Sequence, residues 1–368
     1  MDKKEIKTAL NNIQNAIKKV EKKDFKLLFF VADSKGTPVG SLTYTYELAY
    51  ELQEMGYKVQ MLYAEKEDFV GVKDWLGEKY ANLPHFDTAK QNIDVSPSDF
   101  LFIPELFSNV MVKTKQLPCK KIAILQNFDY LTELIPLGTS WETFGIRDCI
   151  TTSKEMAKRL HEVFPSIRTY VVRPTIDKIF TPSDGAKLII NIVSKDENDI
   201  NRIVKPFKWR YPIYDFVTFR YINGRSREEE AKYLKEGAIT VWADEKTDFG
   251  YSALEAMASG NIVIGKVPEN VPEWMVDENG ELLDNGIWFY KFRDVHAIIA
   301  SVIQTLLYGK IPEGLYENMK ETLSYYTKEK QLVEATAALT ELTTNRVKEL
   351  QLMADALKNN LEKDETKE

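Results

Sequence analysis

The stretch TDFGYSALEAMASG runs from Thr247 to Gly260, and the apolar run IVIG follows at 262–265. Its pattern predicts a loop with a flexible glycine, a short helix that carries Glu255, a glycine stop and a buried strand. A helix entered through Gly250 points its first free backbone N–H groups, and its positive dipole end, at whatever lies above the sheet. This arrangement suits a diphosphate, with Glu255 one turn further in and able to accept hydrogen bonds from a ribose. The same residues equally suit a helix that only packs on a sheet through its apolar side chains.

The composition is that of a globular protein large enough for two domains. The chain has 368 residues, of which 44% are hydrophobic and 29% charged. The formal charge of −7 argues against a protein that coats nucleic acid or an anionic membrane. Two cysteines are too few for a disulfide framework, and the charged start and the short apolar runs predict neither a signal peptide nor a membrane span. We therefore expect a soluble, cytoplasmic protein.

Short apolar runs alternate with helical patterns along the first half of the chain. An amphipathic helix is expected at 4–23, and Ser153 is placed to cap a helix at 154–164. Strands are expected at 27–31, 58–63, 100–103, 121–126, 150–153 and 170–172, with a further helix at 42–55. Alternation of this kind indicates βαβ units and a parallel sheet with helices on both faces.

The rhythm pauses at two prolines and a glycine between residues 174 and 185 and then restarts. Strands are expected at 188–193, 216–219 and 240–242, and helices near 197–207 and at 226–236. The economical interpretation is an α/β fold of two tandem doubly wound, Rossmann-like domains that face each other across a cleft. The expected divisions are an N-terminal helix (1–24), an N-terminal domain (25–174), a hinge (175–186), a C-terminal domain (187–327) and a long terminal helix with a charged tail (328–368).

Apolar residues at a period near 3.6 mark one face of the last helix, which favours a straight helix over a left-handed coiled coil. These residues are Leu332, Ala335, Leu339, Leu342, Val347, Leu350, Ala354, Leu357 and Leu361. Such a helix could pack on its own domain, on the N-terminal helix or on a second copy of the chain. A homodimer through the terminal helices is thus one of the expected arrangements.

Three groups of motifs resemble, in their order, the family 4 glycosyltransferases of the GT-B architecture. The first is SKGTPVGS at 34–41, followed by a helix, and the second is CITTSKEMA at 149–157 with VVRPTID at 171–177. The third is the stretch from Phe249 to Gly260, which resembles that family's donor-binding signature. The resemblance covers roughly residues 26–330.

The resemblance implies transfer of a sugar from a nucleotide-sugar, held mainly by the C-terminal domain, to an acceptor on the N-terminal domain. It implies retention of the anomeric configuration and no metal or other cofactor, with a UDP-sugar as the expected donor. Cations and helix N-termini would then neutralise the departing diphosphate. The positions that match the donor site are Lys195, Arg202, Lys205, Glu255 and the backbone N–H groups of Gly250, Tyr251 and Ser252. Lysines and arginines at these positions also suit a solvated surface.

Two departures from the family pattern fall on the sugar side of the expected donor site. Thr247 stands where the family has a second glutamate, and Asp248 is the candidate catalytic carboxylate beside it. The bulkier sequence ENV at 269–271 precedes Pro272–Glu273, where the family has a glycine pair. Either the sugar is held differently, or the chain is a catalytically silent relative that binds a nucleotide-sugar or a partner.

Polar residues follow the expected strand at 121–126, where a parallel sheet places its ligands. Gln126 and Asn127, with the loop residues Gly40 and Ser41, are the candidate acceptor side of the cleft. Asp129 is a candidate catalytic group that could orient or deprotonate an acceptor hydroxyl, and it could equally cap the following helix. The three histidines, His85, His161 and His296, form no nucleophile–base arrangement in the sequence.

The acceptor is open: a glycan, a protein or a modified DNA base, as in phage-type enzymes, would each fit the resemblance. Aromatic and basic residues alternate between Lys205 and Arg227, a mixture that can bind exposed nucleotides. The same mixture suits a strand with one core face and its flanking loops. The acidic net charge weighs against a DNA substrate.

Overall fold

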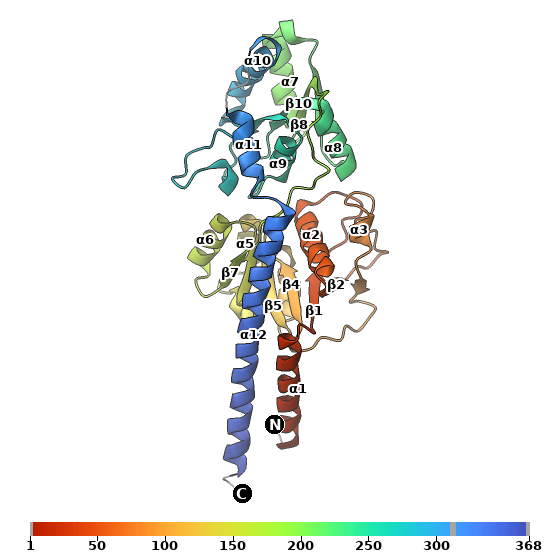
Figure 1. Cartoon of the computed structure of the whole chain (residues 1–368), viewed down its shortest axis with the longest axis vertical. Helices are drawn as coiled ribbons and strands as arrows, with labels where there is room; N and C mark the ends of the chain where they lie inside the picture. The colour runs from red at the N-terminus through yellow and green to blue at the C-terminus, as the bar shows by residue number, and fades with distance from the viewer. Residues whose placement is uncertain (1–2, 310–313, 366–368) are drawn as a thin grey trace.

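The computed structural model describes residues 3–309 and 314–365, and within them two parallel sheets are covered by helices on both faces (Figure 1). The N-terminal sheet has the strand order β3-β2-β1-β4-β5-β6-β7, and the C-terminal sheet has the order β12-β11-β10-β8-β9. The predicted fold class of two tandem doubly wound domains is therefore confirmed. The carboxyl ends of the two sheets face each other across the boundary between the domains.

The centre of the N-terminal sheet is buried on both faces, which explains the continuous apolar runs at 27–31 and 100–103. Leu27 and Phe29 of β1 pack on the face under α2, while Leu28 between them packs on the opposite face. The elements are β1 (Lys26–Phe30), α2 (Gly40–Glu54), β2 (Lys58–Tyr63), α3 (Glu78–Ala81), β3 (His85–Asp87), β4 (Phe100–Pro104), α4 (Ser108–Lys113), β5 (Lys120–Leu125), α5 (Phe128–Leu134), β6 (Asp148–Thr151), α6 (Lys154–Val163) and β7 (Arg168–Val171).

The C-terminal domain has one hydrophobic core, which contains Trp242 and Trp274. Its elements are β8 (Lys187–Val193), α7 (Asn198–Arg210), β9 (Thr218–Ile222), α8 (Arg227–Glu236), β10 (Gly237–Trp242), α9 (Tyr251–Ala258), β11 (Ile262–Lys266), β12 (Ile287–Phe289), α10 (Phe292–Tyr308) and α11 (Leu315–Leu323). The expected strand at 216–219 is misplaced: Phe216 is 64% exposed before the strand, and β9 begins at Thr218. The short strands β3 and β12 were not predicted.

The terminal helices α1 (Lys3–Glu21) and α12 (Lys328–Glu365) lie side by side and extend beyond the N-terminal domain (Figure 1). Polar contacts also bind α12 to that domain. Lys120 on β5 lies 2.6 Å from both Asp148 and Glu349, and Arg346 donates to the carbonyl of Pro118 at 2.7 Å. The last helix therefore returns from the C-terminal domain to pack intramolecularly, one of the arrangements expected for it.

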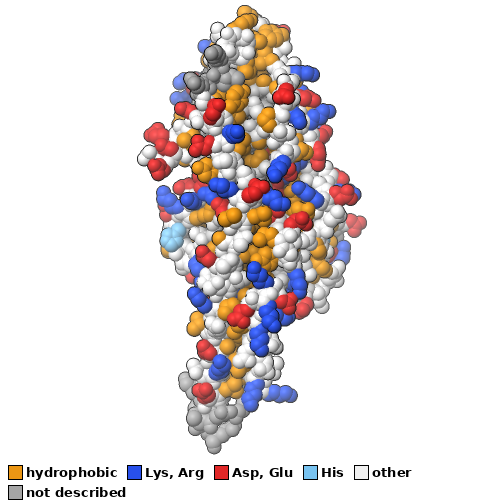
Figure 2. All heavy atoms as spheres, viewed as in Figure 1, with side chains coloured by type: hydrophobic (Ala, Val, Ile, Leu, Met, Phe, Trp, Pro, Cys, Tyr) orange, Lys and Arg blue, Asp and Glu red, His pale blue; other side chains and the backbone are white. Residues whose placement is uncertain are grey.

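The visible surface mixes Lys and Arg with Asp and Glu over both domains (Figure 2). Among the helices described, none combines the length and the apolar character that crossing a membrane requires.

Candidate functional site

The entry to α9 is a tight turn that only glycine fits. Gly250 has φ +77°, and a Cβ there would lie 2.9 Å from Cζ2 of Trp242 and 3.2 Å from Cζ2 of Trp274. The Gly250 N–H donates to Oγ1 of Thr247 at 2.9 Å, and Trp274 Nε1 donates to the carbonyl of Phe249 at 2.6 Å. Thr247, which stands in place of the expected carboxylate, thus fixes the turn that begins the helix.

Asp248 links the two domains. Its side chain is 2% exposed, its Oδ2 accepts the backbone N–H of Phe128 at 2.6 Å, and its Oδ1 lies 3.2 Å from Nη1 of Arg159. The guanidinium of Arg159 lies over the Phe128 ring, 4.3 Å from its centroid. Burial raises the pKa of Asp248, although the Phe128 N–H and Arg159 oppose that shift. The carboxylate is therefore held between the start of α5 and Arg159 on α6, both in the N-terminal domain.

The predicted acceptor residues meet at the carboxyl edge of the N-terminal sheet. Gln126 Nε2 donates to the carbonyl of Ser41 at 3.0 Å, and a Cβ on Gly40 would lie 3.9 Å from the ring of Tyr251 in the C-terminal domain. Asn127 Oδ1 caps α5 by accepting the N–H of Asp129 at 2.8 Å. Asp129 itself is exposed, so the capping role that was one alternative for it belongs to Asn127.

Glu105 is a buried carboxylate that accepts hydrogen bonds from the backbone at this edge of the sheet. The residue follows β4 and is 1% exposed, and its Oε1 accepts the N–H groups of Gln126 at 3.0 Å and Asn127 at 2.8 Å. Burial raises the pKa of Glu105 to about 7. Its position at the carboxyl end of an apolar strand is the same signal that identified Gln126, and sequence reasoning missed it.

The three candidate cations of the C-terminal domain lie at different places. Lys195, in the loop after β8, is 71% exposed and lies 3.1 Å from Asp244, which follows β10. Arg202 on α7 lies 3.0 Å from Asp199 and over the ring of Phe292 on α10. Lys205, also on α7, is exposed. Lys195 alone of the three is in contact with the carboxyl edge of β10.

Glu255 is buried on α9 at 7% exposure, among other charged groups. Burial, followed by repulsion from Glu230, raises its pKa to about 8, while the guanidinium of Arg227 opposes the shift. Arg227 Nη2 lies 2.8 Å from Oε1 of Glu47, so this ion pair joins α8 to α2 across the domain boundary. In the sequence, Glu47 stands between the hydrophobic residues Tyr46 and Leu48, both of which are buried, and this position could have indicated a buried carboxylate. No sequence pattern indicated Arg227.

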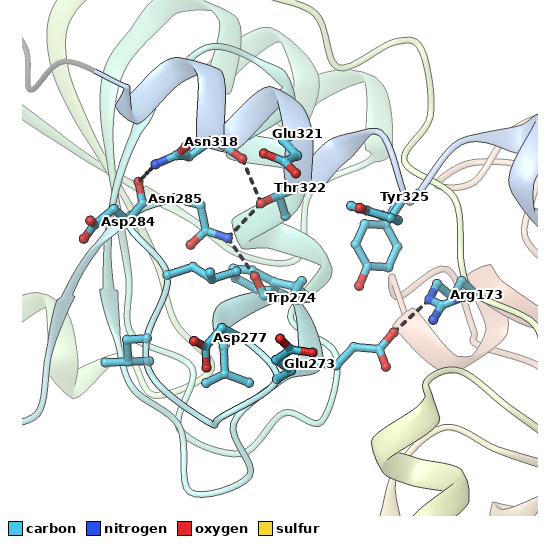
Figure 3. Close-up of a pocket in the computed structure, with 15 residues that line it drawn as sticks. Arg173, Glu273, Trp274, Asp277, Asp284, Asn285, Asn318, Glu321, Thr322 and Tyr325 are labelled. Atoms are coloured by element: carbon cyan, nitrogen blue, oxygen red, sulfur yellow. Dashed lines mark hydrogen bonds and ion pairs between the residues drawn. The ribbon is translucent and has the colours of Figure 1, made fainter.

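Two cavities flank Glu273, the glutamate of the Pro–Glu pair. One, of about 650 Å³, lies between the start of α6 and the loop 269–280 and includes Asp248. The other, of about 610 Å³, lies between the loop 273–285 and α11 (Figure 3). Glu273 Oε1 accepts from Nε of Arg173 at 2.8 Å, and its Oε2 accepts the N–H of Lys154 at 2.9 Å. The Glu273 carboxylate therefore joins Arg173, in the linker 172–186 between β7 and β8, to the start of α6.

The described residues contain no group of three or more His, Cys, Asp or Glu side chains placed to hold a metal ion. What the cleft does offer is a glycine-entered helix N-terminus, a buried carboxylate on that helix, and polar groups from the facing domain. This set can bind an anionic ligand that also carries hydroxyl groups.

Comparison with known proteins gives one curated relative of partial extent. Over 121 residues the chain is 32% identical to an alpha-1,6-glucosyltransferase of Actinobacillus pleuropneumoniae serotype 7 (strain AP76). The matched stretch is 32% of this chain and 36% of that protein, so the match spans about a third of the relative's length. No protein-family model matches the chain.

Solved structures match over most of the chain. Sucrose-phosphate synthase from Thermosynechococcus elongatus aligns with a TM-score of 0.59 at 13% identity, covering 87% of this chain and 100% of that chain. A variant of TarM from S. aureus, in complex with fondaparinux, alpha-GlcNAc-glycerol and UDP, aligns with a TM-score of 0.63 at 9% identity, covering 86% and 99%. The chain thus has the GT-B fold, as its motifs predicted.

Proposed function

We propose that the chain is a glycosyltransferase that takes its sugar from a nucleotide-sugar, with a UDP-sugar as the first donor to test. The observation that carries this proposal is the buried Glu255 on a helix that a left-handed glycine begins, in the second domain of a GT-B fold. The partial likeness to an alpha-1,6-glucosyltransferase and the UDP in the TarM complex support the same class of donor. Membership of family 4 is part of the proposal.

Each candidate residue has a role in this proposal. Lys195 and the N–H groups at the start of α9 neutralise the diphosphate, and Glu255 accepts hydrogen bonds from the ribose. Gln126, Asn127 and Ser41 line the acceptor side, with Asp129 or Asp248 available to orient an acceptor hydroxyl. We also propose that transfer retains the anomeric configuration and needs no metal.

Donor turnover tests the proposal directly. Purified protein is incubated with UDP-glucose, UDP-N-acetylglucosamine, ADP-glucose and GDP-mannose, and the release of the nucleoside diphosphate is followed with and without simple sugar acceptors. Glu255→Ala and Lys195→Ala are expected to reduce turnover at least roughly tenfold, since each removes a hydrogen-bonding group of the proposed donor site. The exposed residues Glu228 and Lys232 on α8 provide matched controls as alanine variants. Full turnover in both site variants would refute the assignment of the donor site.

A second candidate function is nucleotide-sugar binding without transfer. The observation that favours it is the hydrogen bond from the Gly250 N–H to Thr247, because a threonine here supports the turn and supplies no carboxylate for the sugar. The two candidates differ in one measurable property. A silent binder holds UDP or a UDP-sugar in calorimetry and releases no product over a day, whereas any turnover above the buffer control excludes it.

A further inference from the structure

Arg227 begins α8 and lies at the boundary between the domains. Ser226 and Glu229 form a capping box that fixes the start of the helix. The backbone N–H of Arg227 donates to the carbonyl of Trp75, in a loop of the N-terminal domain, at 3.0 Å. The side chain is only 8% exposed. Both the main chain and the side chain of Arg227 therefore contact the facing domain.

Two carboxylates lie beside the buried guanidinium, and two more act on it electrostatically. Glu47 on α2 lies 2.8 Å from Nη2, and Asp177 in the linker lies 3.9 Å from Nε. Glu255 on α9 and Glu230 on α8 interact with the same cation through space. The ring of Phe180 lies 5.8 Å from the guanidinium carbon. One buried cation therefore acts electrostatically on the carboxylate that we propose for the ribose.

The same group retains unused hydrogen-bonding capacity. All three guanidinium nitrogens of Arg227 are buried without a geometrically good hydrogen bond among the described residues, although Nη2 is in the ion pair with Glu47. The same holds for Oε2 of Glu47 and Oη of Tyr251. Tyr251 is the first residue of α9. Buried donors of a charged group are expensive to leave unpaired, so a cluster of them points to a ligand with several oxygen atoms. A nucleoside diphosphate has such oxygen atoms on its ribose and its phosphates.

We propose that Arg227 is a further contact of the donor nucleotide, with its Nε and Nη1 donating to oxygen atoms of the nucleoside diphosphate. Glu47 holds the guanidinium in place from the N-terminal domain, so nucleotide binding favours the closed arrangement of the two domains. The proposal rests on the proposed function, because Glu255 marks the expected place of the ribose. Ribose hydroxyls and phosphate oxygens are both suitable acceptors, and the experiment distinguishes them.

The test compares Arg227→Met and Arg227→Lys with Arg225→Met, a substitution of the exposed arginine two positions earlier. Calorimetry gives the Kd for UDP, 2′-deoxy-UDP and uridine, and thermal unfolding confirms that each variant is folded. We expect Arg227→Met to weaken UDP binding at least roughly tenfold and Arg225→Met to change it less than about twofold. Contact with the ribose predicts that Arg227→Met removes the preference for UDP over 2′-deoxy-UDP. Contact with phosphate predicts that this preference persists while the preference for UDP over uridine shrinks.

Arg227→Lys and Glu47→Gln keep the test decisive if Arg227→Met does not fold. Lysine retains the charge without the planar pair of N–H groups, so we expect weaker UDP binding at a melting temperature near that of the wild type. Glu47→Gln removes the anchoring charge, and we expect it to raise KM for the donor more than it lowers kcat. Wild-type affinity for UDP in folded Arg227→Met or Arg227→Lys would overturn the inference. A wild-type protein that binds none of UDP, ADP, GDP or TDP would instead refute the proposed function.

Discussion

Asp248 in the C-terminal domain accepts the backbone N–H of Phe128 in the N-terminal domain at 2.6 Å, with a side chain that is 2% exposed. The loop that leads into α9 and the N-terminus of α5 are therefore one hydrogen-bonded unit. Glu105 extends this unit by accepting the two preceding N–H groups, those of Gln126 and Asn127. A residue chosen as a catalytic candidate is thus also part of what holds the cleft in its present shape.

Asp248→Asn is expected to lower stability by about 1–2 kcal/mol, because the amide oxygen can still accept the Phe128 N–H but the ion pair with Arg159 is lost. Urea unfolding measures this change. Glu269→Gln, at an exposed position in the neighbouring loop, is the matched control and is expected to change stability by less than about 0.5 kcal/mol. Equal effects from the two substitutions would show that the ion pair between Asp248 and Arg159 contributes nothing to stability.

The fold could be predicted from the sequence because buried parallel strands leave an unmistakable pattern. The run 27–31 is apolar throughout, since β1 is covered on both faces, and the same holds for the part of β5 from Ile122 to Leu125. The three-residue strands β3 and β12 escaped prediction because three residues carry too little periodicity to distinguish a strand from a loop.

The site was harder to predict because part of it exists only where the domains meet. The glycine at position 250 and the carboxylate at 255 belong to one local motif, which the sequence shows directly. Arg159, Arg173 and Arg227 acquire their partners from the other domain or from α12, and those partners are set by how the domains approach each other. No local pattern encodes that approach.

Stability is expected to fall as the pH rises from about 4.5 to 8, and Glu255→Gln should weaken this dependence. In the folded chain burial raises the pKa of Glu255 to about 8, whereas the unfolded chain has the ordinary value near 4.5, so the folded state holds an extra proton between these limits. Glu47 and Glu105, each with a pKa raised to about 7 by burial, act in the same direction. Between pH 5.5 and 8.5 the variant should lose about 1–3 kcal/mol less than the wild type in chemical unfolding. An unchanged pH dependence would show that Glu255 ionises normally in the fold.

Gly250→Ala is expected to destabilise the chain by about 2–4 kcal/mol and to weaken nucleotide binding. The new methyl group would meet the ring of Trp242 at 2.9 Å while the backbone stays at φ +77°, so strain and overlap add. Gly224→Ala provides the matched control: φ is +63° there and a Cβ meets nothing within 4 Å, so only the backbone strain of about 1–2 kcal/mol applies. Unfolding and UDP calorimetry of both variants separate the two effects, and similar losses at both positions would exclude a special role for the α9 turn.

Arg173→Met is expected to cost about 2–4 kcal/mol, because this arginine joins three parts of the chain. Its Nε donates to Glu273 at 2.8 Å, its guanidinium pairs with Glu334 on α12, and its backbone N–H donates to the same Glu334 carboxylate at 2.7 Å. The Arg173 side chain is only 17% exposed, so its removal leaves two half-buried carboxylates without their partner.

The control is Lys178→Met in the same linker. Its ion pair with Glu329 joins side chains that are 86% and 71% exposed, so the substitution should change stability by less than about 0.5 kcal/mol. Denaturant unfolding should show a smaller midpoint for Arg173→Met and, if the domains then unfold separately, two transitions in place of one. A midpoint within error of that of Lys178→Met would mean that packing alone, without this ion-pair cluster, joins the linker to α12.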